Sequence, residues 1–365
     1  MRHQSSAILV LMAVVLSIGC AGRGMPDWAK QGKTSQYPVD NYLLGVGQAD
    51  SKEAAQERAY AAVARIFKSE VTAQSRDWES FLLLERKGQT NTERRLTLDQ
   101  VTKVSTDKVL ESVRVLETWR DPKSGQEYAL AGMDRGQAAT AMIERMTTLD
   151  QSIETEVNEA RSAADKLSRV RNLRRAIKNL VLREAYNVDL RIIRASGHGN
   201  DPAYRVADLT NELEQFLTGN VSVGVEVMGE QAELTRRAVI EGLIREGLPV
   251  SAKADGAEAA KPVQLLVKGT VGLWDLTMPD PRFRYARWCS DFVVTDRDTQ
   301  RIVGAVSIGG REGHVNATEA RAKAVRIMQQ ELTSNLAKTL AAYVYGETDP
   351  PAELPPASCP KEGAK

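Results

Sequence analysis

The chain has 365 residues, of which 49 are lysine or arginine, 48 are aspartate or glutamate and 3 are cysteine. One hydrophobic core rarely serves a chain of this length, so we expect two or three compact units. The near balance of charges leaves no basic field for nucleic acid, and we expect no nucleic-acid partner.

The first 19 residues are predicted to be a signal peptide. Arg2 provides a positive start, and an apolar run of about ten residues follows it, which is typical of export signals. A bilayer span takes about twenty apolar residues, so this run is too short to cross a membrane. We find no second long apolar stretch, and residues 20–40 are expected to be a tether.

Residues 17–20 read Ser-Ile-Gly-Cys and resemble a lipobox, in which a small residue precedes the cleaved bond and a cysteine follows it. Leu16 stands one position further upstream than the leucine of that motif. We predict that Cys20 carries the lipid anchor, which is the only membrane contact that the sequence indicates. By similarity to sorted lipoproteins, Ala21 as the second mature residue favours the outer membrane. The alternative is an ordinary secretory signal cleaved elsewhere, with no role for Cys20.

Residues 41–135 are predicted to form a small α+β domain. A short strand, 42–47, ends in glycines at a strand-to-helix turn, and Asp50 or Ser51 can cap the helix that follows. Four side chains share one face of that helix, and their small size would let it lie close to a sheet: Ala55, Ala59, Ala62 and Ile66. We also expect a strand at 70–75 and a hairpin of 108–119 with 127–133.

Residues 136–218 are predicted to be a long helical segment. Apolar side chains recur at spacings of three and four from Leu149 to Leu180, which indicates either one helical rod or an antiparallel pair. A second amphipathic helix is expected at 204–217. Four basic residues are expected to lie mostly on the solvated side rather than to form a lipid or peptidoglycan patch: Arg171, Arg174, Arg175 and Lys178.

Residues 219–346 are predicted to form a second α+β domain, with helices on one face of its sheet. The expected elements, in order, are strand 221–227, helix 230–246, strand 263–274, hairpin 284–295 with 301–309, and helix 317–345 capped by Asn316. The proline-rich residues 347–365 are expected to be a disordered tail. In an oxidising compartment Cys289 and Cys359 could form a disulfide; the alternatives are two unpaired thiols or pairing with another chain.

The sequence offers no support for an enzyme, and we expect no catalytic residue, no metal and no cofactor. His198 and His314 have no other ligands at metal-binding spacing. Gly45 and Gly47 lack the third glycine of a dinucleotide-binding turn, and no nucleophile motif occurs. Four tryptophans could form a recognition surface, although packing at strand ends is favoured: Trp28, Trp119, Trp274 and Trp288.

The N-terminal part of the mature chain resembles the LPP-twenty family of outer-membrane lipoproteins. The resemblance covers roughly residues 25–139 and rests on an ordered series of short motifs: Pro26-Asp27-Trp28, Tyr42, Gly45-Val46-Gly47, an alanine-rich helix, Tyr128-Ala129-Leu130-Ala131 and Asp134-Arg135. The same module is similar to the N-terminal domain of flagellar assembly protein T, whose next domain resembles the N-terminal domain of TolB. Residues 219–346 could be that second module.

This resemblance implies a protein without catalytic residues that takes part in assemblies at the outer membrane. We therefore expect a lipid-anchored structural or adaptor protein on the periplasmic face, with envelope proteins or further copies of itself as partners. The alternative function is a periplasmic carrier that holds a lipid or glycan between domains. Such a carrier would need an apolar pocket of about several hundred Å³.

Overall fold

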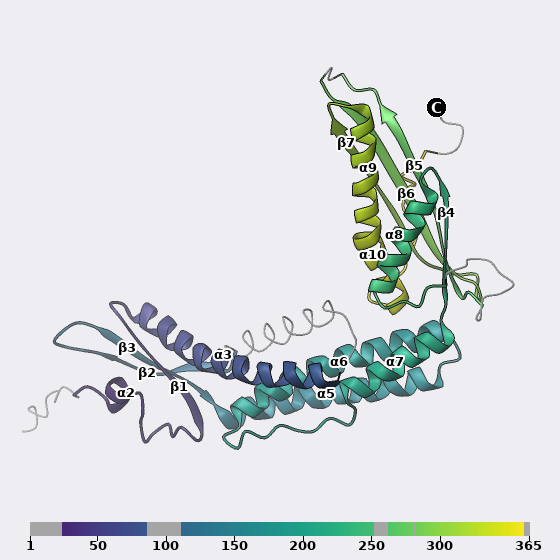
Figure 1. Ribbon diagram of the computed structural model, residues 1–365. Coiled ribbons are helices and arrows are strands. Elements are labelled where there is room, and N and C mark those ends of the chain that lie inside the picture. The colour runs from purple at the N-terminus through teal and green to yellow at the C-terminus, as the bar shows by residue number, and fades with distance from the viewer. Residues whose placement is uncertain (1–23, 86–110, 252–261, 280–281, 361–365) are drawn as a thin grey trace, which may run out of the picture. The chain divides into compact units, whose positions relative to one another are not determined.

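A computed structural model describes residues 24–85, 111–251, 262–279 and 282–360 (Figure 1). The described chain forms two compact units. The first contains residues 24–84, 111–147 and 182–201, and the second contains 148–181 and 202–360. Both combine helices with a sheet, so the predicted α+β class is confirmed. The helical residues 136–218 are divided between the two units.

The first unit contains a three-stranded antiparallel sheet in the order β1-β3-β2. Its strands are β1 (Tyr42–Ala49), β2 (Val113–Arg120) and β3 (Glu127–Asp134). The predicted hairpin is confirmed from Val113 onward, whereas residues 111–112 are helical and 108–110 lie outside the described residues. Residues 121–126 connect β2 to β3. A short helix, α2 (Asp27–Gln31), precedes the sheet.

Helix α3 (Lys52–Glu85) packs on one face of this sheet and begins after Ser51, whose hydroxyl accepts a hydrogen bond from the amide of Ala54 at 3.2 Å. Two predictions here are wrong. The chain is helical at 70–75, where we expected a strand. The glycines expected at a turn lie inside β1, where a Cβ on Gly45 would come within 2.7 Å of the Ala59 carbonyl oxygen. They allow α3 to approach the strand closely.

The buried face of α3 is also different from the predicted one. It consists of four side chains at a constant spacing of four, Ala55, Ala59, Val63 and Phe67, all with at most 1% of their surface exposed. Ala62 is only half-buried and Ile66 is exposed. The helix is rotated so that the two alanines nearest β1 face the glycines, and the larger Val63 and Phe67 follow in the same row.

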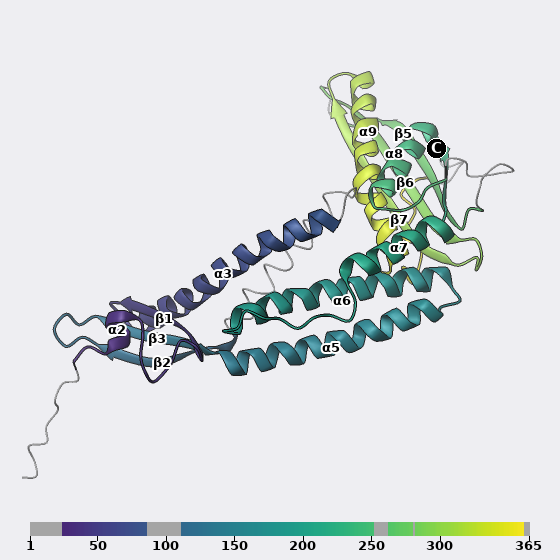
Figure 2. The ribbon, with the colours of Figure 1, turned by 60° about the horizontal axis from the view of Figure 1, so that its bottom comes forward.

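Two long helices follow, α5 (Arg135–Ser162) and α6 (Lys166–Ile193). In the first unit Arg135 donates hydrogen bonds to the carbonyls of Ile192 and Ile193, and in the second Asn179 donates to Glu156. In each unit, segments of α5 and α6 therefore lie antiparallel. Of the two predicted alternatives, the antiparallel pair is confirmed and the single rod is wrong. Helix α7 (Val206–Asn220) lies alongside them in the second unit (Figure 2).

The sheet of the second unit has the order β4-β5-β6-β7, with β4 and β5 parallel and the other pairs antiparallel. Its strands are β4 (Val223–Gly229), β5 (Leu265–Leu276), β6 (Arg284–Asp296) and β7 (Ile302–His314). Its helices are α8 (Ala232–Arg245), α9 (Ala317–Glu331), the π-helical turn η2 (Leu332–Leu336) and α10 (Ala337–Tyr345). Element order and type agree with the prediction.

One face of this sheet is covered by the helices. Trp288 and Phe292 of β6 share a hydrophobic core with Ala324 and Met328 of α9. Asn316 caps α9 as expected, because its side chain accepts a hydrogen bond from the amide of Thr318 at 2.8 Å. Since side chains alternate along a strand, Cys289 and Asp291 of β6 point to the opposite face. We call this second face the open face.

Candidate functional site

The N-terminal helix α2 fixes the start of the folded chain. The side chain of Trp28 is 3% exposed, and its indole nitrogen donates a hydrogen bond to the Glu117 carboxylate of β2 at 2.8 Å. Glu117 pairs with Leu130, whose side chain points away from the face that packs on α3. Helix α2 therefore covers the other face of the first sheet, so the expected tether, residues 20–40, is docked to the domain at this helix.

Cys20 lies outside the described residues, but the chain limits how far it can stand from the sheet. Only residues 21–27 separate Cys20 from Trp28. At about 3.3–3.6 Å per extended residue, this connection spans at most about 25–30 Å. A lipid on Cys20 would consequently hold the first unit close to the membrane surface.

The C-terminal tail is attached to the open face of the second sheet. Cys289 of β6 and Cys359 form a disulfide, with their Cα atoms 5.1 Å apart. The amides of Ser358 and Cys359 donate hydrogen bonds to the two carboxylate oxygens of Asp291 at 2.8 and 2.9 Å. The expected disordered tail is thus held at this point, although it forms no helix or strand within the described residues 347–360.

The hydrogen bonds from the tail act on the charge of Asp291. Partial burial opposes ionisation, but the amides of Cys359 and Ser358 and the Ser358 hydroxyl outweigh it, so the pKa of Asp291 is lowered. A lowered pKa in the folded state stabilises the protein above the unfolded pKa, and this contribution is lost as the pH falls through the folded value. Asp291 therefore supports the attached tail at neutral pH.

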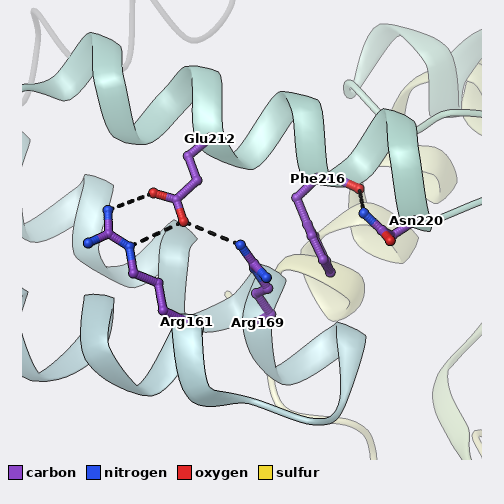
Figure 3. Close-up of polar contacts among 5 residues, drawn as sticks. All are labelled: Arg161, Arg169, Glu212, Phe216 and Asn220. Carbon is purple, nitrogen blue, oxygen red and sulfur yellow. Dashed lines mark hydrogen bonds and ion pairs between the residues drawn. The ribbon is translucent and has the colours of Figure 1, made fainter.

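A cluster of charges joins the three long helices of the second unit (Figure 3). Glu212 of α7 forms ion pairs with Arg161 of α5 at 2.9 Å and with Arg169 of α6 at 3.4 Å. The Arg169 guanidinium also lies 4.4 Å from the centre of the Phe216 ring. Hydrogen bonding from Arg161 is the main cause of the lowered pKa of Glu212, and partial burial opposes it. Both arginines pair with this one carboxylate, and Arg169 also stacks on Phe216, so we interpret the cluster as structural.

We expect the Glu212→Gln variant to lose about 1 kcal/mol of unfolding free energy at pH 7, because it removes an acceptor shared by two half-exposed arginines. The loss should shrink as the pH falls through the lowered pKa of Glu212, where the parent carboxylate becomes protonated. Urea unfolding at several pH values measures this. Glu214→Gln removes the same charge from the same helix and is the control. An equal loss in both variants would contradict the assignment.

The basic residues of α6 depart in part from the predicted solvated face. Arg175 and Lys178 are exposed as expected. Arg171, however, donates a hydrogen bond to the Tyr343 carbonyl at 3.1 Å, and Arg174 forms an ion pair with Glu347 at 3.1 Å. These two arginines hold the end of α10, where the negative end of the helix dipole attracts positive charge.

The four tryptophans do not form one surface. Trp28 and Trp288 are each 3% exposed and belong to the cores of different units. Trp119 is half-buried beside Tyr128, with ring centres 5.4 Å apart. Trp274 is half-buried on the open face of the second sheet. The favoured prediction, that the tryptophans pack in the protein interior, holds for Trp28 and Trp288.

Few features of the described residues indicate a ligand. They contain no group of three metal-binding side chains, and none of their helices combines the length and apolarity that a membrane crossing requires. His198 and His314 belong to different units. A cavity lined by Phe67, Met133 and Met142 has a volume of only about 10 Å³, far below the roughly 300 Å³ or more of a ligand pocket. It gives the carrier alternative no support.

Several solved structures are distantly similar to the chain. A secreted protein from Helicobacter pylori is 15% identical, with 80% of this chain and 97% of that chain covered and a TM-score of 0.36. A minor lipoprotein from Acinetobacter baumannii is 11% identical, with 36% and 96% covered and a TM-score of 0.26. Rare lipoprotein B from Shewanella oneidensis is 16% identical, with 34% and 96% covered and a TM-score of 0.23. At these TM-scores the likenesses indicate no shared role.

No curated protein matches the chain. A family model does match it, that of the LPP20 lipoprotein, over residues 26–134. The match begins at Pro26, beside the docked Trp28, and ends at Asp134, the last residue of β3. It therefore spans α2 and the complete first sheet. The predicted resemblance is confirmed: residues 26–134 are similar to the LPP20 lipoprotein family.

Proposed function

We propose that this protein is a lipid-anchored adaptor of the bacterial envelope, attached through Cys20 to the periplasmic face of the outer membrane. The observation that carries the proposal is the LPP20 lipoprotein match at residues 26–134, which begins six residues after the cysteine of a lipobox-like sequence. Its expected partners are envelope proteins or further copies of the chain.

The structure supplies a physical basis for tethering. Acyl chains on Cys20 would each contribute about 0.8 kcal/mol per buried methylene, so two or three chains would give stable attachment. The short link to Trp28 then keeps the LPP20-like module near the membrane. The lipid would position the module, and the sheets and helices would present surfaces to partners.

Metabolic labelling with a clickable palmitate analogue tests the anchor. We expect the natural chain to incorporate label and to sediment with membranes, and the Cys20→Ala variant to lose both, because the thioether attachment requires the cysteine sulfur. An ordinary secreted protein would behave alike in both forms. That outcome would contradict the proposal.

The choice of membrane has its own test. In the sorting rule by which Ala21 favours the outer membrane, aspartate at the second mature position retains lipoproteins in the inner membrane. The Ala21→Asp variant keeps Cys20 and should remain labelled, but it should move to the inner-membrane fraction on a sucrose gradient. A labelled variant whose distribution equals that of the natural chain would remove the support for outer-membrane sorting.

A further inference from the structure

One end of the open face carries arginines and aromatic rings side by side. Trp274 of β5 pairs with Arg287 of β6, and Arg287 pairs with Arg311 of β7, so the three side chains form one row across the sheet. Tyr285 lies two residues before Arg287 on the same strand and points to the same face. We call these four residues the arginine face.

The two arginines of this face stand directly opposite each other on neighbouring strands. Cross-strand neighbours on one face have Cβ atoms about 5 Å apart, and like charges in this position are destabilising. Both arginines are exposed. Arg287 contacts an aromatic ring, and Arg311 contacts an aromatic ring and the Met278 sulfur. Among the described residues, no carboxylate pairs with either guanidinium. An external anion would relieve this repulsion.

The aromatic rings hold both guanidinium groups over the sheet. The Arg287 guanidinium lies 5.7 Å from the centre of the Trp274 ring, and that of Arg311 lies 5.6 Å from the centre of the Tyr285 ring. Such stacking restricts long side chains and leaves their N–H groups free to donate to an oxyanion. Two stacked, unpaired arginines therefore resemble a phosphate-binding surface.

Large apolar side chains are exposed beside the arginine face. Met278 and Phe283 flank the connection between β5 and β6 and are 36% and 40% exposed. Phe283 lies 6.5 Å from Tyr285, measured between ring centres. Arginine next to exposed apolar and aromatic side chains is the composition of a surface that lies in the headgroup region of a bilayer, where rings and methylenes meet lipid and guanidinium groups meet phosphate.

We infer that the arginine face, together with Met278 and Phe283, docks the second unit onto the surface of a phosphate-rich, anionic membrane. The charge selects an anionic surface, and the exposed apolar side chains select a bilayer over a soluble polyanion, which offers them nothing to contact. This contact would be additional to the lipid proposed at Cys20 and does not depend on it, since it uses different residues.

Sedimentation with vesicles tests the inference on a chain of residues 24–365, which retains every described element and lacks Cys20. We expect it to bind vesicles of phosphatidylglycerol and phosphatidylethanolamine, to release as salt rises, and to ignore vesicles of phosphatidylcholine. The Arg287→Gln/Arg311→Gln variant should bind about 30-fold more weakly, which corresponds to about 1 kcal/mol for each arginine.

Arg236→Gln/Arg237→Gln changes the net charge equally on α8, which packs on the opposite face of the sheet, and should bind like the parent. Phe283→Ser leaves the charge unchanged and should also weaken binding, about tenfold, if the ring enters the headgroup region. Circular dichroism confirms that each variant is folded.

If both double-arginine variants lost vesicle binding equally, the effect would come from net charge alone, and the inference would be overturned. Failure of the parent to sediment with anionic vesicles would do so as well. Retention on immobilised heparin without vesicle binding would assign the surface to a soluble polyanion instead. Because the tested chain lacks Cys20, these results do not depend on whether Cys20 is acylated in cells.

Discussion

The Cys359→Ser variant is expected to unfold with a free energy about 4 kcal/mol lower than that of the oxidised protein. The disulfide joins residues 70 positions apart, and a cross-link of that length removes much conformational entropy from the unfolded chain. It also keeps the tail beside Asp291, so the hydrogen bonds that Ser358 and Cys359 donate to that carboxylate depend on it. Urea unfolding under oxidising conditions measures the difference.

Two controls separate the covalent bond from the contacts of the tail. Reduction of the parent with dithiothreitol should reproduce the stability of Cys359→Ser and should leave that variant unchanged. Ser358→Ala keeps the bond but loses the hydroxyl contact with Asp291 at 2.8 Å, and should cost only about 1 kcal/mol. If alkylation and mass spectrometry find both thiols free in protein isolated from cells, the bond does not form there.

The order of the elements could be predicted from sequence where apolar residues recur at a regular spacing over a long stretch, or where turn-forming residues separate two strands. Asp121 to Gly125 lies between two alternating runs, and the hairpin of β2 and β3 follows from it. The long apolar series from Leu149 to Leu180 predicts helices, but the turn at Asp165 depends on a local contact. Its carboxylate accepts from the Ser168 amide at 2.8 Å, so it caps α6 and separates the two helices.

Other features depend on contacts that a local pattern does not contain. The segment 70–75 mixes β-branched and polar residues, which suits an edge strand, yet it continues a helix begun eighteen residues earlier at Lys52. Glu212 meets Arg161 and Arg169, which are 51 and 43 residues away. The row of Trp274, Arg287 and Arg311 requires the register of three strands. Sequence spacing alone could not place these groups together.

The pairing of Cys289 and Cys359 likewise could not be decided from the sequence alone. Cys289 lies on a strand and Cys359 lies in a proline-rich tail, and these positions are compatible with a disulfide, two thiols or a link to another chain. The choice depends on the tail reaching the open face of the sheet. Asp291, two residues after Cys289, provides that contact, because side chains two apart on a strand share a face.

The Gly47→Ala variant is expected to lose about 3 kcal/mol of stability in the first unit. A Cβ at this position would overlap the carbonyl of Ala55 and the amide of Ala59, which are backbone atoms and cannot rotate away. Helix α3 would have to move off β1 as a whole, and its row of buried side chains would lose contact with the sheet. Overpacking against side chains costs about 1–3 kcal/mol, and a clash with backbone belongs at the upper end of that range.

Hydrogen exchange of peptides covering β1 and β3 measures this loss locally, because the two units need not unfold together. The same methyl group added by Gly24→Ala meets no atom within 4 Å and is the matched control. Protection should fall in β1 and β3 of Gly47→Ala and stay at the parent level in β5 and β6. Parent-like protection throughout would mean that α3 does not lie against the glycines of β1, and the close approach that explains Gly45 and Gly47 would have to be abandoned.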